Sequence, residues 1–308
     1  MKLRLGTRGS ALAWTQSSTV ARALEQHGVE VEMVRIKTEG DRDQARPFAE
    51  VGAPGLFVRA LESALIDGRV DLAVHSYKDL PSDSPDELVV SATPPRADAR
   101  DRVLIAPSAF GADAGPIPLR RGARVGTASA RRIALLGELR PDVTAEFLRG
   151  NVDTRLQRLA DGDFDAILLA AAGLDRLAAG GGARPSPELH ARELDPSLFV
   201  PAPSQGAVCV QVRRDDADAI VATKKLDDAE TSRAVAVERR LLALVEAGCQ
   251  APFGAYARAT GTGKLELFAA LERDGRLRRA HVAGGDAEVE TLARAAYDRL
   301  LAAGEAGG

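Results

Sequence analysis

Two cysteines occur in this chain of 308 residues, and one of them stands where a thiol could do chemistry. Cys249 follows a long amphipathic helical pattern that stops at Gly248, and Pro252 prevents regular structure from resuming at once. The thiol is therefore expected on a short, constrained turn that a reagent can reach. Cys209 lies in the apolar run 207–210 and is expected to be a small buried side chain of a strand. Because a lone cysteine is more often inert than reactive, other residues must decide the role of Cys249.

Arginines and small hydroxyl residues recur at three places where an expected strand gives way to an expected helix. These places are 7–10, 127–132 and 148–151, the last with Arg155 about one turn into the next helix. Each combines free main-chain N–H groups, hydroxyls and guanidinium groups, which is how proteins bind carboxylate or phosphate oxygens. Helix caps and solvated arginines explain any single place better. Three together predict a polyanion bound in a cleft between two α/β domains, since ligands of such sheets bind beyond the carboxyl ends of strands.

A fourth polar segment, 75–81, also follows a short buried strand. Pro81 biases Leu80 towards extended geometry, so the segment is expected to be a loop and not the start of a helix. In this loop Lys78 could bind an anion and Asp79 could do acid–base work. Taken alone, Asp79 is more often an ordinary turn aspartate. Neither a Walker-type phosphate loop nor a dinucleotide fingerprint is present in the sequence.

The elements that must position these residues alternate through the first two thirds of the chain. In the first block we expect strands 3–7, 29–38 and 70–75 and helices 11–26 and 55–66, with Ser10 as the first N-cap. This order predicts a parallel, helix-covered sheet. In the second block we expect strands 103–105, 124–126, 143–148, 165–170 and 207–213 and helices 129–139 and 152–160. The last block, helix 230–246, strands 254–259, 264–272 and 277–283 and helix 286–303, predicts a small α+β domain with antiparallel strands.

Length and composition exclude several classes of protein. The chain suits two or three domains, and 45% hydrophobic residues can bury proper cores. No stretch approaches a membrane span, the N-terminus lacks the apolar core of a signal peptide, and two cysteines fit a reducing compartment. The net charge of −3 gives no bulk attraction to nucleic acid, and the four histidines are scattered singly. We therefore expect a cytoplasmic protein that binds no metal, no nucleic acid and no membrane.

With these residues assembled, the chain resembles the porphobilinogen deaminases, also called hydroxymethylbilane synthases, over essentially its full length. The matching segments occur in order at 7–13, 75–81, 125–132, 148–155, 171–177 and 248–254. Any one of them is a weak signal, but six in order over about 250 positions are very specific.

The resemblance implies an α/β fold and a monomer of three domains. Two domains similar to periplasmic binding proteins, 1–101 with 204–224 and 102–203, would flank the active-site cleft, and 225–308 would form an α+β domain with an antiparallel sheet. It further implies a transferase that joins four porphobilinogen molecules, with loss of ammonia, onto a covalent dipyrromethane. Hydrolysis would then release hydroxymethylbilane and leave the dipyrromethane cofactor on the protein.

The resemblance also assigns roles to residues of this chain. Cys249 would hold the cofactor through a thioether, and Asp79 would stabilise cationic pyrrole and azafulvene species and assist proton transfers. The implied cofactor-binding residues are Ser76, Lys78, Thr127, Ser129, Arg131, Arg132 and Gly150. The implied substrate-binding residues are Arg8, Ser10, Arg149, Arg155 and Arg176. The physical logic agrees, because every pyrrole ring carries two carboxylates and arginine stays charged whatever its neighbours.

Two departures from the family pattern bear on the active-site loop and the hinge. Pro54 precedes Gly55 where the family usually has lysine, and Ser204 replaces a glycine before Gln205. Two other classes of protein remain open. A non-catalytic polyanion-binding protein with the same two lobes would need neither the reactive thiol nor the aspartate. An enzyme handling phosphoryl or phosphoribosyl groups would want an acidic metal-binding cluster near the phosphates, and none is evident.

Overall fold

A computed structural model describes residues 1–36, 56–111, 115–246, 251–261, 263–284 and 288–302, with the backbone alone at 56 and 57. The chain divides into two compact units. Unit 1 comprises Met1–Ala97 and Ala207–Ser232, and unit 2 comprises Asp98–Gly206 and Arg233–Gly308. The main chain therefore passes between the units at 97–98, 206–207 and 232–233.

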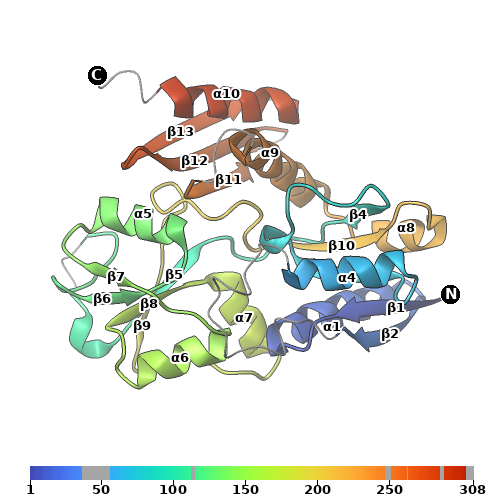
Figure 1. Cartoon of the computed structure of the whole chain (residues 1–308), viewed down its shortest axis with the longest axis horizontal. Coiled ribbons are helices and arrows are strands. Elements are labelled where there is room, and N and C mark those ends of the chain that lie inside the picture. Colours follow the sequence, from blue (N-terminus) through green and yellow to red (C-terminus); the bar gives the residue numbers. More distant parts are fainter. Residues whose placement is uncertain (37–55, 112–114, 247–250, 262, 285–287, 303–308) are drawn as a thin grey trace. The chain divides into compact units, whose positions relative to one another are not determined.

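Unit 1 is built on a five-stranded sheet of order β2-β1-β3-β10-β4, of which β1, β2, β4 and β10 are labelled in Figure 1. Its strands are β1 (Lys2–Thr7), β2 (Glu30–Arg35), β3 (Leu72–Ser76), β4 (Leu88–Ala92) and β10 (Val208–Arg213). The three strands expected from the first third of the sequence are parallel, as predicted, with β1 between β2 and β3. Strand β10, which follows a chain crossing, runs antiparallel to both β3 and β4. The sheet is therefore mixed.

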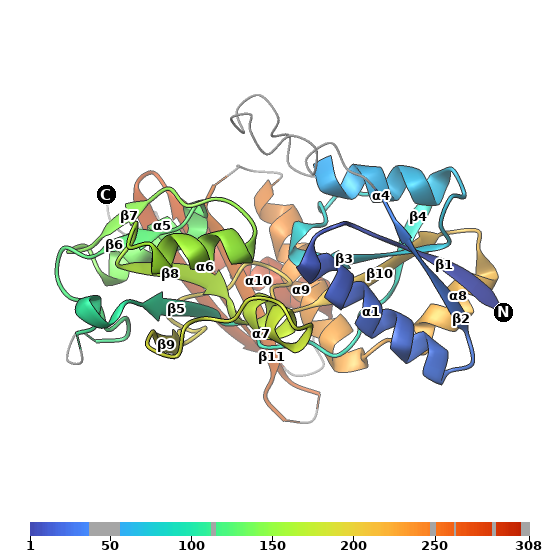
Figure 2. The same ribbon diagram turned by 90° about the horizontal axis from the view of Figure 1, so that it is seen from below.

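Helices cover both faces of this sheet because successive side chains of a strand point to opposite sides. The helices are α1 (Ala11–Gln26), α4 (Leu56–Ile66) and α8 (Ala217–Lys224). Leu72 and Val74 of β3 pack with Leu24 of α1 and with residues of α8, whereas Ala73 packs with Leu61 of α4. Figure 2 shows α1 and α4 on opposite sides of the strands.

Unit 2 contains a second five-stranded sheet, of order β7-β6-β8-β5-β9. Its strands are β5 (Asp101–Ile105), β6 (Arg124–Gly126), β7 (Thr144–Glu146), β8 (Ala166–Ala170) and β9 (His190–Glu193). Strand β6 is parallel to β7 and β8, and β5 is antiparallel to β8 and β9. The two sheets thus share one layout, in which a parallel trio is extended by an antiparallel strand that arrives just after a chain crossing.

The helices of this second sheet are α5 (Ala130–Leu139), α6 (Val152–Ala160) and α7 (Ala171–Ala179). Leu135 of α5 packs with Val103 of β5 on one face. Leu104 of β5 points the other way and packs with residues of α6 and α7, such as Leu159. The expected α/β architecture is confirmed in both units.

The C-terminal part of unit 2 is an antiparallel meander of β11 (Phe253–Ala259), β12 (Leu265–Arg273) and β13 (Arg276–Gly284). Helices α9 (Ala229–Glu246) and α10 (Val289–Ala302) share one apolar core with it, through residues such as Val237, Leu267 and Leu292. The predicted α+β arrangement is confirmed. Its status as a separate third domain stays a prediction, because the division of the chain groups it with the second sheet.

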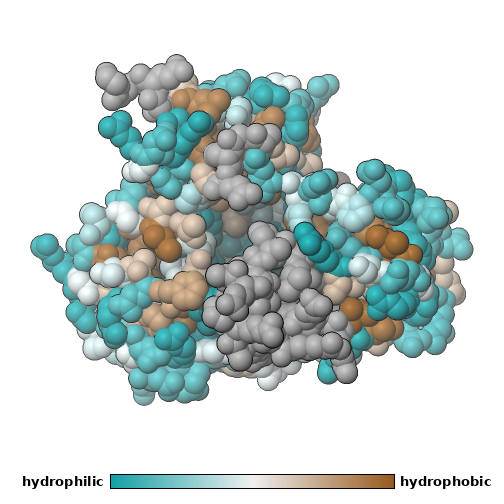
Figure 3. Space-filling model, viewed as in Figure 1, coloured by the Kyte–Doolittle hydropathy of each residue, from teal (hydrophilic) through white to brown (hydrophobic). Residues whose placement is uncertain are grey.

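The surface carries little continuous apolar area on the face drawn in Figure 3. Hydrophilic residues cover most of the described part of that face, and apolar residues are scattered. None of the described helices is long and apolar enough to cross a membrane.

Candidate functional site

In unit 1 the candidate residues gather at the edge where parallel strands end. Strand β1 pairs with β3 through Leu5 opposite Leu72, so the segments that follow the two strands emerge at the same edge. Arg8 follows β1, and Ser10 caps α1 by accepting a hydrogen bond from the N–H of Ala13 at 3.3 Å. Residues 76–79 follow β3.

Asp79 lies on a single 3-10 turn, Tyr77–Asp79, which the Leu80 N–H closes by donating to the Tyr77 carbonyl at 3.2 Å. We expected a loop here and not the start of a helix, and the structure has this one turn before the chain becomes extended. Leu80 is extended, with φ of −78° and ψ of 123°, as Pro81 requires. One turn therefore fits between strand and proline, and it leaves Asp79 exposed at the strand end.

The base of this turn is held on two sides. The hydroxyl of Ser76 and the side-chain amide of the buried Gln16 of α1 exchange hydrogen bonds of 3.0 and 3.2 Å. The main-chain N–H of Tyr77 donates to the carbonyl of Ala207, just ahead of β10, at 3.1 Å. The serine that we predicted as a cofactor ligand is thus engaged with a glutamine, and the turn is tied to β10.

A chain of buried polar side chains begins at His75 in β3, two residues before the same turn. His75 Nε2 is 2.9 Å from Gln211 Oε1, and Gln211 Nε2 donates to Glu62 Oε1 at 3.1 Å. Since an amide oxygen only accepts, this chain requires the proton of His75 on Nε2. Burial lowers the pKa of His75 to about 4, against a smaller opposing effect of the bond to Gln211. His75 is therefore a neutral structural side chain at pH 7.

In unit 2 the candidate residues again follow parallel strands. Thr127 and Ser129 follow β6, where Ser129 caps α5 and donates its own N–H to Thr127 Oγ1 at 3.2 Å. Arg149 and Gly150 follow β7. Gly150 has φ of 112°, and a Cβ atom there would meet the side chain of Thr154 at 3.0 Å, so both backbone and space favour glycine.

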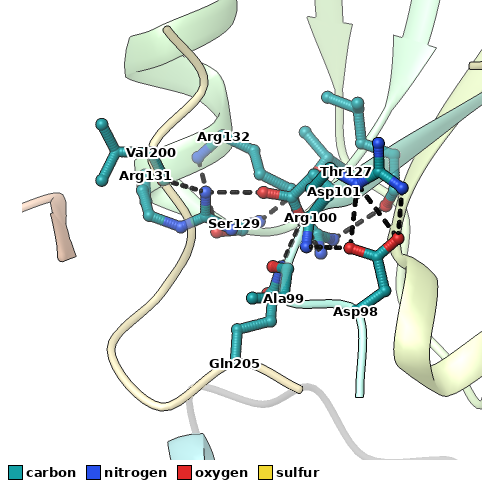
Figure 4. A network of polar contacts seen from close by, with 11 residues as sticks. Asp98, Ala99, Arg100, Asp101, Thr127, Ser129, Arg131, Arg132, Val200 and Gln205 are labelled. Carbon is teal, nitrogen blue, oxygen red and sulfur yellow. Dashed lines mark hydrogen bonds and ion pairs between the residues drawn. The ribbon is translucent and has the colours of Figure 1, made fainter. Parts of the chain in front are cut away.

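Arg131 and Arg132 are not solvated forks but a buried pair that shares one carboxylate (Figure 4). Asp101 Oδ2 accepts a 2.7 Å hydrogen bond from Nη1 of Arg131. Asp101 Oδ1 accepts bonds of 3.0 and 2.7 Å from Nε and Nη2 of Arg132. Arg131 also donates to the main-chain carbonyl of Val200, and Arg132 donates to that of Leu168. The two guanidinium groups are therefore fixed in orientation.

Asp101 is the functional candidate that sequence reasoning missed. It is fully buried at the start of β5, which runs antiparallel and so begins where the parallel strands end. Burial alone would raise the pKa of Asp101, but the charges of Arg131 and Arg132 outweigh burial and hold it below the ordinary value. Gln205 Nε2 donates to the same Oδ1 at 3.1 Å and to the carbonyl of Ala99 at 2.8 Å. The signal in the sequence that could have found Asp101 is a charged residue at the first position of a largely apolar strand.

Two other arginines of this edge, Arg155 and Arg176, donate hydrogen bonds to main-chain carbonyls. Arg155 donates to the Gly150 carbonyl at 2.8 Å, and Arg176 donates to the Gly206 carbonyl at 2.8 Å. Within the described residues, neither has a carboxylate within 4.0 Å. Burial lowers the pKa of both, and for Arg155 the charges of Arg132 and Arg149 add to the effect. Partly buried guanidinium groups without a carboxylate partner among the described residues are of the kind that bind anions, and at Arg155 two neighbouring positive charges add repulsion that an anion would relieve.

The structure thus places the candidate residues in two groups. Unit 1 holds Arg8, Ser10, Ser76, Lys78 and Asp79, and unit 2 holds Thr127, Ser129, Arg131, Arg132, Arg149, Gly150, Arg155 and Arg176. Cys249 and Pro54 lie outside the described residues. Cys209 is fully buried in β10, as predicted. In the described part of the chain no three His, Cys, Asp or Glu side chains are grouped to hold a metal ion.

Two family models match the chain and together span most of it. The model described as "Porphobilinogen deaminase, dipyromethane cofactor binding domain" matches residues 3–221. The model described as "Porphobilinogen deaminase, C-terminal domain" matches residues 232–299. The boundary between the two matches falls near the start of α9.

Curated relatives agree with these models. The porphobilinogen deaminase of Trichlorobacter lovleyi is 41% identical over 309 residues, covering 98% of this chain and 94% of the relative. That of Mycobacterium tuberculosis is 44% identical over 275 residues, covering 89% and 82%. Among solved structures, an ancestral cationic amino acid solute binding protein gives a TM-score of 0.43 at 15% identity, covering 73% of this chain and 87% of its own. That score is below 0.5, and the α/β fold class rests on the two helix-covered sheets of the structure.

Proposed function

The chain belongs to the porphobilinogen deaminase family, and we propose that Asp79 and the arginines of the two strand edges are the residues with which it carries out the family reaction. The enzyme is a transferase of tetrapyrrole biosynthesis, and its cofactor is a dipyrromethane. In this reaction four porphobilinogen molecules are joined head to tail with loss of four molecules of ammonia. Water then releases hydroxymethylbilane.

The donor set of unit 2 fits the carboxylates of a dipyrromethane. The observation that carries the proposal is that Arg155 lies near two other positive charges, Arg132 and Arg149, at the edge where β6 and β7 end. Each pyrrole ring brings two carboxylates, and planar guanidinium groups bind carboxylates through paired hydrogen bonds. Arg131, Arg132, Thr127 and Ser129 would hold the cofactor, and Arg149, Arg155 and Arg176 would hold the incoming rings. The bound cofactor supplies the free end to which the first ring is joined, and Cys249 would anchor it.

Asp79 supplies a negative charge to each addition. An addition breaks the bond between the methylene carbon and the amino nitrogen of the substrate, and the nitrogen leaves as ammonia. A carbon–carbon bond forms between two rings, and one ring proton is released. Positive charge develops on the pyrrole nitrogen while the carbon–nitrogen bond breaks, and a carboxylate fixed beside it lowers the barrier. The short turn at the end of β3, held by Ser76 and Gln16, keeps Asp79 exposed and its backbone fixed. Its carboxylate is also placed to take up the released proton.

The family match favours this transferase over a polyanion-binding protein without catalysis. The test is the stoichiometry of the reaction, measured with purified protein and porphobilinogen. We expect four molecules of ammonia for each hydroxymethylbilane released, and the ratio should not change with substrate concentration. Binding of porphobilinogen without release of ammonia would contradict the proposal.

We further propose that the enzyme acts as a cytoplasmic monomer. The composition supports the location, since two cysteines in a long chain fit a reducing compartment. Light scattering during size-exclusion chromatography should give the mass of a single chain.

A further inference from the structure

We propose that Asp101 is a positioning residue for the cofactor carboxylates, acting through the two arginines that it holds. The proposal rests on the proposed function, since it names the residue that orients part of the anion-binding group. Nothing in the reaction requires a second carboxylate on this side, and Asp101 itself is fully buried. Its effect must therefore pass through Arg131 and Arg132 (Figure 4).

The geometry supports positioning, because the carboxylate uses some donors of each arginine and leaves others. Arg132 gives Asp101 one hydrogen from Nε and one from Nη2, and gives the Leu168 carbonyl one from Nη1. A guanidinium group carries five N–H hydrogens, so two on Arg132 have no acceptor among the described residues. Arg131 gives one Nη1 hydrogen to Asp101 and the other to the Val200 carbonyl, and its Nε and Nη2 donors have no acceptor in the described part of the chain. Both side chains are held on one side while donors on the other side stay available for an anion.

The charges support the same conclusion. Two adjacent guanidinium groups, each under a tenth exposed, repel one another, and burying them without a counter-ion would be very costly. Asp101 offsets one of the two charges, so the cluster keeps a net charge of about +1 for an incoming carboxylate. An uncharged residue at 101 would lose this offset and leave both arginines free to change rotamer.

Asp101 is also anchored independently of the arginines. Gln205 joins it to the carbonyl of Ala99, and these two residues lie beside the chain crossings at 206–207 and 97–98. A neutral donor holds the carboxylate in place without competing for its charge. The anchor predicts that Gln205→Met produces a weaker form of the defect expected for Asp101→Asn.

The test is a double-mutant cycle on the holoenzyme with Asp101→Asn, Arg132→Lys and the double variant. Asp98→Asn is the matched control. Asp98 lies three residues before Asp101 and also pairs with an arginine, Arg100. We expect Asp101→Asn to lower kcat about 10- to 100-fold with a smaller change in KM, since misplaced binding groups disturb alignment more than affinity. In the Arg132→Lys background, Asp101→Asn should lower kcat by less than a third of the factor that it has in the wild-type background. A merely structural role would give equal factors in both backgrounds.

A second readout is independent of turnover. The fraction of each purified variant that carries the dipyrromethane, measured by intact mass, should fall in Asp101→Asn and stay at the wild-type level in Asp98→Asn. If Asp101→Asn does not fold, the same double-mutant cycle is measured with Gln205→Met in place of Asp101→Asn, and its result decides the proposal. Equal factors in the two backgrounds, or normal loading and turnover of a folded Asp101→Asn, would overturn the proposal. An inactive wild-type protein would instead refute the proposed function.

Discussion

Ser204 donates its main-chain N–H to Oε2 of Glu238 at 2.6 Å, and it does so from a left-handed backbone with φ of 63°. Its side chain is fully buried, and its hydroxyl has no hydrogen-bond partner among the described residues. The other oxygen of the buried Glu238 accepts the N–H of Ala257 in β11 at 2.7 Å. A serine is thus held in a glycine-like conformation in the segment just before a chain crossing.

Replacing Ser204 by glycine should therefore stabilise the protein. Left-handed backbone costs a side-chain residue about 1–2 kcal/mol and a buried unpaired hydroxyl about 1–3 kcal/mol, against about 1 kcal/mol for the flexibility of glycine in the unfolded chain. The net gain is about 1–4 kcal/mol, so we expect Tm to rise by at least about 2 °C. Asp274→Gly is the control, because Asp274 has φ of 55° but is exposed, and aspartate tolerates this conformation. An unchanged or lower Tm for Ser204→Gly would contradict the argument.

Asp79→Asn should remove activity without affecting folding. The side chain is exposed, so its loss should leave Tm within about 1 °C of the wild type. Loss of one preorganised electrostatic group costs about 10²–10³ in rate, and the loss recurs at every addition. Asp79→Glu keeps the charge but displaces it, and should retain more activity than Asp79→Asn. Near-normal turnover of porphobilinogen by Asp79→Asn would leave Asp79 as a turn residue.

Arg155→Met should stabilise the cofactor-free protein while impairing turnover. The pKa of Arg155 is lowered by burial and by neighbouring positive charges, so its charge is unfavourable until an anion binds. In a Cys249→Ala background we expect Tm to rise by about 1–3 °C. Arg158→Met is the matched control on the same helix, because Arg158 pairs with Asp163 at 2.8 Å. A Tm that falls further in Arg155→Met than in the control would argue against an anion site here.

His75 should make unit 1 less stable in mild acid. Its folded pKa of about 4 lies below the ordinary value of 6.5, so the unfolded chain binds the proton more readily. The stabilisation is present above pH 6.5 and is lost as pH falls towards 4. Between pH 7 and pH 5 the loss should be about 2 kcal/mol.

The single tryptophan, Trp14 of α1, allows urea unfolding of unit 1 to be followed by its fluorescence. His75→Gln should abolish most of the acid-dependent loss, and the same change at the exposed His27 should not. Parallel pH dependence in the wild type and His75→Gln would refute the role of His75.

Much of the fold was predictable because the amphipathic patterns are strong. Helices 11–26 and 152–160 were predicted residue for residue, and the C-terminal meander within one residue at each strand. Among the described strands and α-helices, those that were missed are β4, β9, α7 and α8. Strand β9 is exposed along its whole length and so has no alternating pattern, and α7 begins directly after β8 without a break.

The site was predictable as a set of residue types but not as a set of contacts. Helix caps and arginines at strand ends locate an anion site, because strand order alone fixes where they emerge. The partner of Arg131 and Arg132 lies about thirty positions away in the sequence, at the first residue of β5. Only the antiparallel pairing of β5 with β8 brings Asp101 to this edge.

The most direct test of the account is the intact mass of the purified, active enzyme. We predict a mass above that of the sequence by one dipyrromethane, which is lost in Cys249→Ser and kept in Cys209→Ser, since Cys209 is fully buried in β10. Addition of porphobilinogen should raise the mass further in equal steps, each one substrate less one ammonia. An active enzyme whose mass equals that of the unmodified sequence would contradict the account.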